Sequence, residues 1–231
     1  YLLDNINSIE MLDEVMEPGG ALEGLRQARD EGLVGSIGIS SHKTSVLEEA
    51  LLRDVFEAIE VPFNAIEQES VFLLRRATAG NVGTLVMKPL AGGALQNATA
   101  ALNFVLEHTV HCAIPGMQSI KEVEENVAVT GSISAPERSR LLKEVEKWED
   151  RFCRRCEYCI PVCPEEINIA KILLFGSYSE RYNLTEWARD RYSEMDPNAE
   201  ACRKCGRCEE RCPYDLPIRT MLQEAHTELT A

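Results

Sequence analysis

The sequence predicts an α/β domain with a parallel sheet, followed by a small, entirely helical domain. Along residues 1–130, short apolar runs rich in β-branched residues alternate with helical stretches. They recur at intervals of roughly 25 residues, which is typical of βα units in a parallel sheet. From residue 153 onward no strand pattern remains, and two cysteine-rich segments and helical stretches take its place.

The α/β domain is predicted from alternating strand and helix patterns. In the predicted helices apolar residues recur at helical spacing, as Val46, Leu47 and Ala50 do. Five strands are too few to close a barrel of about eight by themselves. The predicted strands lie within 1–6, 34–40, 56–63, 83–90 and 111–117, and the predicted helices within 19–32, 45–55, 94–108 and 119–129.

A helix is predicted at the junction between the two domains. Ser134 can cap it, Pro136 suits its first turn, and Glu137 lies three residues after the cap, which is the spacing of a capping box. The predicted domains are therefore residues 1–135, a linker helix over 136–152 and a helical domain over 153–231.

Composition excludes several classes of partner. The chain has 231 residues, is 45% hydrophobic and carries a net charge of −14. The charge argues against nucleic acid and against an anionic membrane surface. No apolar run approaches the roughly 18 residues that a membrane helix needs. Tyr1 opens directly into an apolar run, so we expect that an upstream part of the protein is missing.

The cysteines form two copies of one motif, C-x2-C-x2-C-x3-C-P. Three closely spaced cysteines can hold three corners of a [4Fe–4S] cluster, and the fourth ligates the other cluster in two-cluster ferredoxins. The proline after it fixes φ and turns the chain sharply. The spacing therefore predicts two clusters, one held by Cys153, Cys156, Cys159 and Cys212 and the other by Cys163, Cys202, Cys205 and Cys208.

Other interpretations of the cysteines stay open. Eight thiols could hold two zinc ions, although zinc needs neither three successive x2 steps nor the repeated Cys-Pro. Disulfides are less favoured because such clusters in cytosolic proteins serve metal or redox roles, and we expect a cytoplasmic protein. Clusters could also be purely structural. Cys112 stands apart from both motifs and is expected to be a small core residue.

Cations lie between the ligands of both motifs. They could offset the negative charge of thiolate-bound clusters and so tune the reduction potential. The simpler interpretation is that most are solvated loop charges. These residues are Arg154, Arg155, Arg203, Lys204 and Arg207.

Three segments of the first domain carry a resemblance to a known family: "ALEGLRQARDEGLVGSIGISSH", "VMKPLAGGAL" and "AIPGMQSIKEVEENV". Together with the double cysteine motif, they resemble aldo/keto reductases that carry a C-terminal 4Fe–4S domain. The resemblance implies a (β/α)8 TIM barrel of which this chain holds strands four to eight. It also implies that the family's catalytic Asp, Tyr and Lys lie upstream, so this chain alone should be inactive in carbonyl reduction.

The resemblance also implies positions for NAD(P)H. Asp4 takes the place of the family's catalytic His, and Ser40 and Ser41 that of the pair which holds the nicotinamide amide. Glu122 replaces the Arg that grips the 2′-phosphate, so a preference for NADP does not follow. Taken singly, each match also fits an ordinary loop or helix. The remaining implied positions are Glu60, Met87 and Lys88 near nicotinamide, Gly116 and Ser119 near phosphate, and Glu125 and Asn126 near adenine.

The sequence therefore predicts an oxidoreductase in which hydride chemistry at the barrel exchanges single electrons with two clusters. Its partner would be a redox protein or a small-molecule electron donor or acceptor. The alternative is a ferredoxin-like electron carrier whose barrel portion is a docking scaffold without catalysis. A third reading is an interaction module stabilised by zinc.

Overall fold

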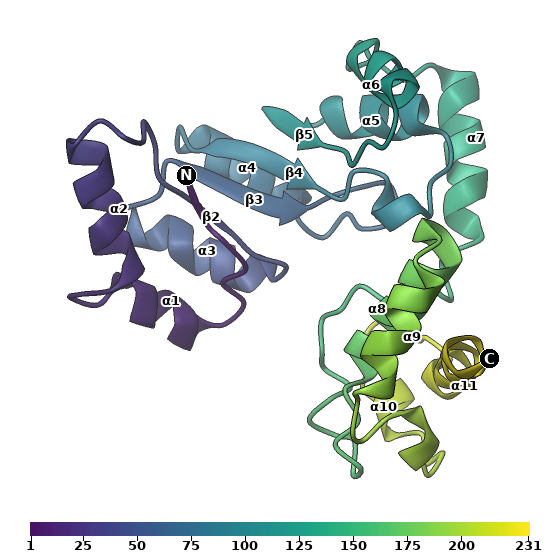
Figure 1. Cartoon of the computed structure of the whole chain (residues 1–231). Helices are drawn as coiled ribbons and strands as arrows, with labels where there is room; N and C mark the ends of the chain where they lie inside the picture. Colours follow the sequence, from purple (N-terminus) through teal and green to yellow (C-terminus); the bar gives the residue numbers. More distant parts are fainter. The chain divides into compact units, whose positions relative to one another are not determined.

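The computed structural model describes the whole chain, residues 1–231. The chain divides into two compact units, Tyr1–Glu144 and Val145–Ala231. The boundary falls near the end of the helix that the sequence assigned to a linker. Each unit is built around its own secondary structure (Figure 1).

The first unit contains a sheet of five parallel strands in the order β1-β2-β3-β4-β5. Every predicted strand is confirmed. Because consecutive strands are neighbours, each crossover advances one place in the same direction, as in a (β/α)8 barrel. The strands are β1 (Leu2–Leu3), β2 (Gly38–Ser40), β3 (Ala58–Pro62), β4 (Gly83–Met87) and β5 (Cys112–Ile114).

Helices connect these strands. The four predicted helices are confirmed, while two further helices were not predicted, α1 and α4. Ser8 caps the first of them by accepting a hydrogen bond from the Met11 N–H at 3.1 Å. The helices are α1 (Ile9–Met16), α2 (Ala21–Asp30), α3 (Thr44–Arg53), α4 (Val71–Ala79), α5 (Ala98–Leu106) and α6 (Ile120–Val127), with the 3₁₀ turn η1 at Ala91–Gly93.

The two faces of the sheet differ in what covers them. Ile39, Ile59 and Val86 are completely buried on the face along which α3, α4 and α5 lie (Figure 1). The register places Leu85 beside Cys112 on the opposite face. There Cys112 is exposed, so the expectation that it is a core residue is wrong. The reason is its place: β5 is an edge strand, and no helix covers this face of it.

The predicted junction helix begins where expected but ends early. The Ser134 N–H donates to Glu137 Oε2 at 2.9 Å, which is the carboxylate half of the predicted capping box, while the Ser134 hydroxyl also donates to Glu137. The helix α7 spans Ala135–Glu146 rather than reaching residue 152. After it the chain turns so that Phe152 is only 5% exposed. The Arg181 guanidinium lies 5.6 Å from the centre of the Phe152 ring, which fixes this turn against α8.

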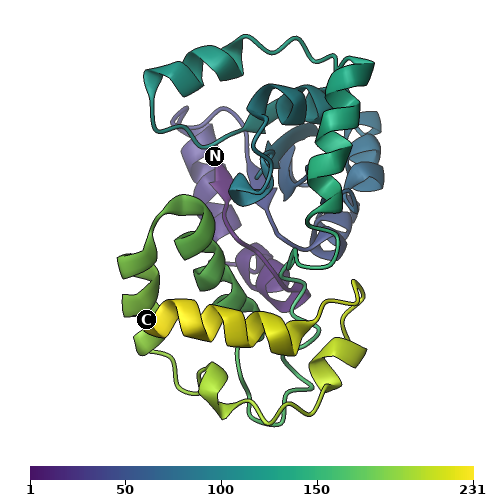
Figure 2. The ribbon, with the colours of Figure 1, turned by 90° about the vertical axis from the view of Figure 1, so that its right-hand side faces the viewer.

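The second unit is helical throughout, as predicted. Its helix α11 packs against α8 and α9 (Figure 2). The thiols of Cys159 and Cys208 belong to the hydrophobic core of this unit. None of the helices in the chain is long and apolar enough to span a bilayer. The elements are α8 (Ile169–Tyr182), α9 (Thr185–Ser193), η2 (Ala199–Ala201), α10 (Arg207–Glu210) and α11 (Ile218–Thr230).

The backbone of this unit repeats itself with the step of 49 residues that leads from Cys153 to Cys202. The same step relates the starts of α8 and α11. Gly176 and Ala225 are also equivalent, and they contact each other across the two helices. Contact between equivalent residues is what a twofold relation produces for residues near its axis. Residues with positive φ repeat in the same way: Arg155 with Lys204, Glu157 with Gly206, and Glu166 with Asp215.

Candidate functional site

The second unit contains a cavity at the first cysteine motif. It encloses about 360 Å³ of space, open solvent included, between the motif, α8 and the start of α11. Ile169, Leu173 and Leu216 give it an apolar wall. The thiol-bearing residues around it are Cys153, Cys156, Cys159 and Cys212.

A second cavity lies at the other motif and encloses about 340 Å³ on the same measure. Ile169 also lines this cavity, so the two spaces adjoin the same residue. The thiol-bearing residues around it are Cys163, Cys202, Cys205 and Cys208. The structure therefore brings together the same two sets of four that the motif spacing predicts, each with three thiols from one motif and one from the other.

Each cavity is lined by four thiols that come from both motifs. Four thiolates around zinc would each lie about 2.3 Å from one point, whereas no group of three His, Cys, Asp or Glu side chains here is placed to hold a single metal ion. Thiolates are the ordinary ligands of iron–sulfur clusters. The residues present thus fit a [4Fe–4S] cluster in each cavity.

Burial disfavours ionisation of two cysteine thiols at the first cavity. Burial raises the pKa of Cys159 to about 12, and the neighbouring thiols Cys153 and Cys156 add to this effect. Burial also raises the pKa of Cys153. A thiolate in such a place needs a positive partner, which bound iron supplies. Some stabilisation comes from the backbone, since the Lys204 N–H donates to Cys202 Sγ at 3.4 Å.

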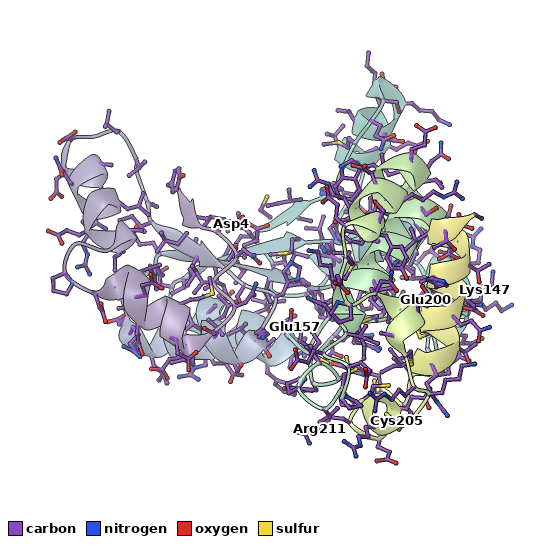
Figure 3. All side chains as sticks on the ribbon, turned by 60° about the horizontal axis from the view of Figure 1, so that its bottom comes forward. Asp4, Lys147, Glu157, Glu200, Cys205 and Arg211 are labelled. Atoms are coloured by element: carbon purple, nitrogen blue, oxygen red, sulfur yellow. The ribbon has the colours of Figure 1, made fainter.

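The predicted nucleotide positions divide into two groups. Asp4 directly follows β1, and Ser40, which ends β2, pairs with Glu60 in the middle of β3, so the three residues lie side by side across adjacent strands. The Ser40 hydroxyl donates to Asp4 Oδ1 at 2.6 Å. Burial, and then the negative charge of Asp4, raise the pKa of Glu60. Asp4 is labelled beside the sheet in Figure 3.

The other predicted nicotinamide positions are Ser41, Met87 and Lys88. The Ser41 hydroxyl is buried and donates to Asn7 Oδ1 at 3.1 Å, so it supports the loop after β1. Met87 ends β4 and pairs with Ile114 in the register. Lys88 follows it with a positive φ of 54°.

The second group lies before and along α6. Ser119 caps this helix by accepting a hydrogen bond from the Glu122 N–H at 3.2 Å. An added Cβ at Gly116 would meet no atom within 4 Å, so the backbone there is open to solvent. Glu125 is paired with Lys121 at 3.6 Å on the exposed surface, and Asn126 lies one residue further along α6.

Comparison with known proteins agrees with this division of the chain. Residues 1–100 match the model of the aldo/keto reductase family, and residues 152–216 match that of a 4Fe-4S dicluster domain. The first part of the chain therefore resembles aldo/keto reductases, and the second part resembles 4Fe–4S dicluster domains.

Solved structures support the fold of the reductase portion. An aldo-keto reductase from Bacillus halodurans, in its holo form, matches with a TM-score of 0.51 and 21% sequence identity. The match covers 62% of this chain and 59% of that one. At this identity the likeness concerns the fold, which is the barrel type expected from the sequence.

Curated relatives match only a short part of their own length. The acetyl-CoA decarbonylase/synthase complex subunit alpha 1 of Methanosarcina mazei is 25% identical over 89 residues, which are 38% of this chain and 10% of that protein. The same subunit of Methanosarcina barkeri is 29% identical over 73 residues, or 32% of this chain and 8% of that protein. The chain therefore spans about a tenth of these relatives.

The structure also adds charged residues of the iron–sulfur domain that the sequence reasoning missed. Arg181 reaches the first motif from α8, and no local pattern indicates this. Glu165 was also missed, and it pairs at 2.6 Å with Arg203, a cation that the sequence does indicate. Arg219 and Glu209, which pair at 2.7 Å, were both missed. Alignment of the two motifs could have identified Glu165, because it lies at the same place after its motif as Tyr214 does after the other.

Proposed function

We propose that this chain belongs to an oxidoreductase in which an aldo/keto-reductase-type barrel works together with two [4Fe–4S] clusters that transfer single electrons. The observation that carries the proposal is the presence of two adjacent cavities, each surrounded by four thiols from both motifs. A crossed arrangement of this kind is what two-cluster ferredoxins use.

The residues have distinct tasks in this function. When bound, each cluster supplies one-electron redox chemistry. The cysteine thiolates hold the iron, and Leu173 and Leu222 exclude water from the two cavities. Ile169 lines both cavities, so the two redox sites would be close to each other. Two neighbouring one-electron sites suit a partner reaction that moves the two electrons of a hydride.

The test is the metal and sulfide content of the chain after anaerobic purification. We expect about eight iron atoms and about eight acid-labile sulfides per chain, as two four-iron clusters require. Zinc in place of iron, with no sulfide, would overturn the proposal. A stoichiometry near four would show that only one of the two cavities is used.

A second candidate function is an electron carrier whose barrel portion serves only for docking. It is favoured by the local hydrogen bonds of Ser40 and Ser41, whose hydroxyls donate to Asp4 and Asn7. Titration of the cluster-loaded chain with NADH and with NADPH, followed by calorimetry, separates the two candidates. Binding of either nucleotide favours the reductase-type function, and its absence at millimolar concentration favours the carrier.

A further inference from the structure

Partly buried positive charge lies at the first cavity: Arg154 lines it, and Arg155 and Arg181 lie near Cys153. Arg154 and Arg155 are partly buried, and the Arg154 guanidinium stacks over Tyr214 at 4.0 Å. Arg155 immediately precedes a ligand, and its backbone N–H donates to the thiol of Cys153. Arg181 adds a third partly buried guanidinium from α8. The one carboxylate that lines this cavity, that of Glu157, belongs to an exposed residue.

The second cavity shows the reverse arrangement. The side chains of Glu165 and Glu209 are only 20% and 22% exposed. Their partners Arg203 and Arg219 are 72% and 47% exposed. Glu165 lines the second cavity together with Arg203 and Arg219, and its side chain is the least exposed of the three. Glu209 does not line this cavity, but it directly follows the ligand Cys208.

Shielding from water decides which of these charges most affects the reduction potential of a bound cluster. Water screens an exposed charge strongly, whereas a partly buried charge acts through a lower effective dielectric. Reducing a thiolate-bound cluster by one electron adds one negative charge to it. A shielded cation therefore favours the reduced state, and a shielded carboxylate opposes it.

We propose that the shielded arginines give the Cys153 set the cluster of higher reduction potential, while the shielded carboxylates give the Cys202 set the cluster of lower potential. Here the Cys153 set means Cys153, Cys156, Cys159 and Cys212, and the Cys202 set means Cys163, Cys202, Cys205 and Cys208. This inference rests on the proposed function, because it requires a cluster in each cavity.

The proposal gives the electron path a direction. Cys205, labelled in Figure 3, is the one exposed residue among the eight motif cysteines. An external one-electron donor of still lower potential would give one electron to the site at the Cys202 set. That electron then moves past Ile169 to the site at the Cys153 set, so the donor is oxidised by one electron and the inner site is reduced by one.

The first experiment is an anaerobic titration of the cluster-loaded chain with dithionite, followed by electron paramagnetic resonance. We expect two separate one-electron steps. Arg155→Met should lower the equilibrium constant of the upper step about tenfold, which is about 59 mV for one electron. Arg155→Lys keeps the charge and should restore most of it. The matched control is Lys204→Met, since Lys204 is the exposed equivalent of Arg155 in the repeat and should move neither step as far.

The second experiment changes the other cavity and predicts a shift of opposite sign. Glu165→Gln should raise the equilibrium constant of the lower-potential reduction step about tenfold, which is again about 59 mV. The potential of the upper step should not change. Glu157→Gln removes the same charge from an exposed position and should have a much smaller effect. Iron and sulfide contents equal to those of the parent chain show that each variant is loaded.

The outcomes separate this inference from the proposed function. One unresolved step in the parent chain, or a shift of the lower step by Arg155→Met, overturns the inference alone. A chain that contains no iron and sulfide overturns the proposed function, and the inference falls with it.

Discussion

The two halves of the helical unit follow the same backbone path and place different side chains on it. Their positive φ angles, helix starts and thiols all repeat with the same step. At one equivalent place, however, Arg154 stacks on Tyr214, whereas Arg203 pairs with Glu165. The comparison teaches that thiol spacing and the Cys-Pro turn determine the backbone, while the charges around each cavity vary independently of it.

The largest effect is expected from removing the fourth cysteine of each motif, which lines the cavity of the other motif. Cys212→Ala should eliminate the cluster of the first motif, and Cys163→Ala that of the second, because each thiol lines the cavity of the other motif. Iron should fall from about eight to about four atoms per chain in each variant. The upper redox step should survive only in Cys163→Ala.

The control for this pair is Cys112→Ala, which removes an exposed thiol outside both cavities and should leave the iron content unchanged. Survival of the upper step in Cys212→Ala, or loss of all iron in both variants, would contradict separable crossed sets.

How far the sequence predicts this molecule depends on how local each feature is. The strands and most helices of the first unit follow from residue patterns within single elements. The grouping of the thiols also follows from spacing, since Cys212 must cross to reach the first motif's cavity. The exposure of Cys112 could not be predicted from its apolar surroundings, because it depends on which face of β5 the helices cover.

The charges around the cavities were the least predictable part of the candidate site. Cations between the cysteines are visible in the sequence, but their shielding is set by packing. Arg181 reaches the first motif only because α8 folds back beside Trp148 and Phe152. The early end of α7 has the same origin, since the chain leaves the helix to bury Phe152. Such features require the tertiary structure.

The contact between the halves gives a second, smaller test. A Cβ at Gly176 would lie 3.2 Å from the Cβ of Ala225, so a larger side chain must push α8 and α11 apart. Gly176→Val should destabilise the loaded chain by about 2 kcal/mol, as overpacking does. Anaerobic denaturant unfolding, followed by the helical circular dichroism, measures this.

The matched control is Gly24→Val, also within a helix but with no atom within 4 Å of the added Cβ. It should change stability by no more than about 0.5 kcal/mol. Equal effects of the two substitutions would show that the helices do not meet closely at their equivalent residues.

The smallest expected effect concerns a backbone position with positive φ at which one half of the helical unit has glycine and the other half has glutamate. Gly206 has φ of 83° and Glu157, its equivalent, has φ of 67°. Because a side chain costs about 1 kcal/mol or more in this conformation, Gly206→Ala should destabilise the loaded chain by about that amount. No atom lies within 4 Å of the added Cβ, so a clash would not explain the loss.

Glu157→Gly should instead stabilise the loaded chain against unfolding. Glu157→Gln is the control for the lost charge. The gain in unfolding free energy should be about 0.5 kcal/mol, which is smaller than the loss caused by Gly206→Ala. The reason is that glycine also gains conformational freedom in the unfolded chain. The same denaturant unfolding measures both. If the first half is stabilised while the second is weakened, the two motifs share one backbone path despite their different residues. A loss of stability in both variants would instead mean that the Glu157 side chain contributes contacts that outweigh its backbone strain, and that the halves differ in more than charge.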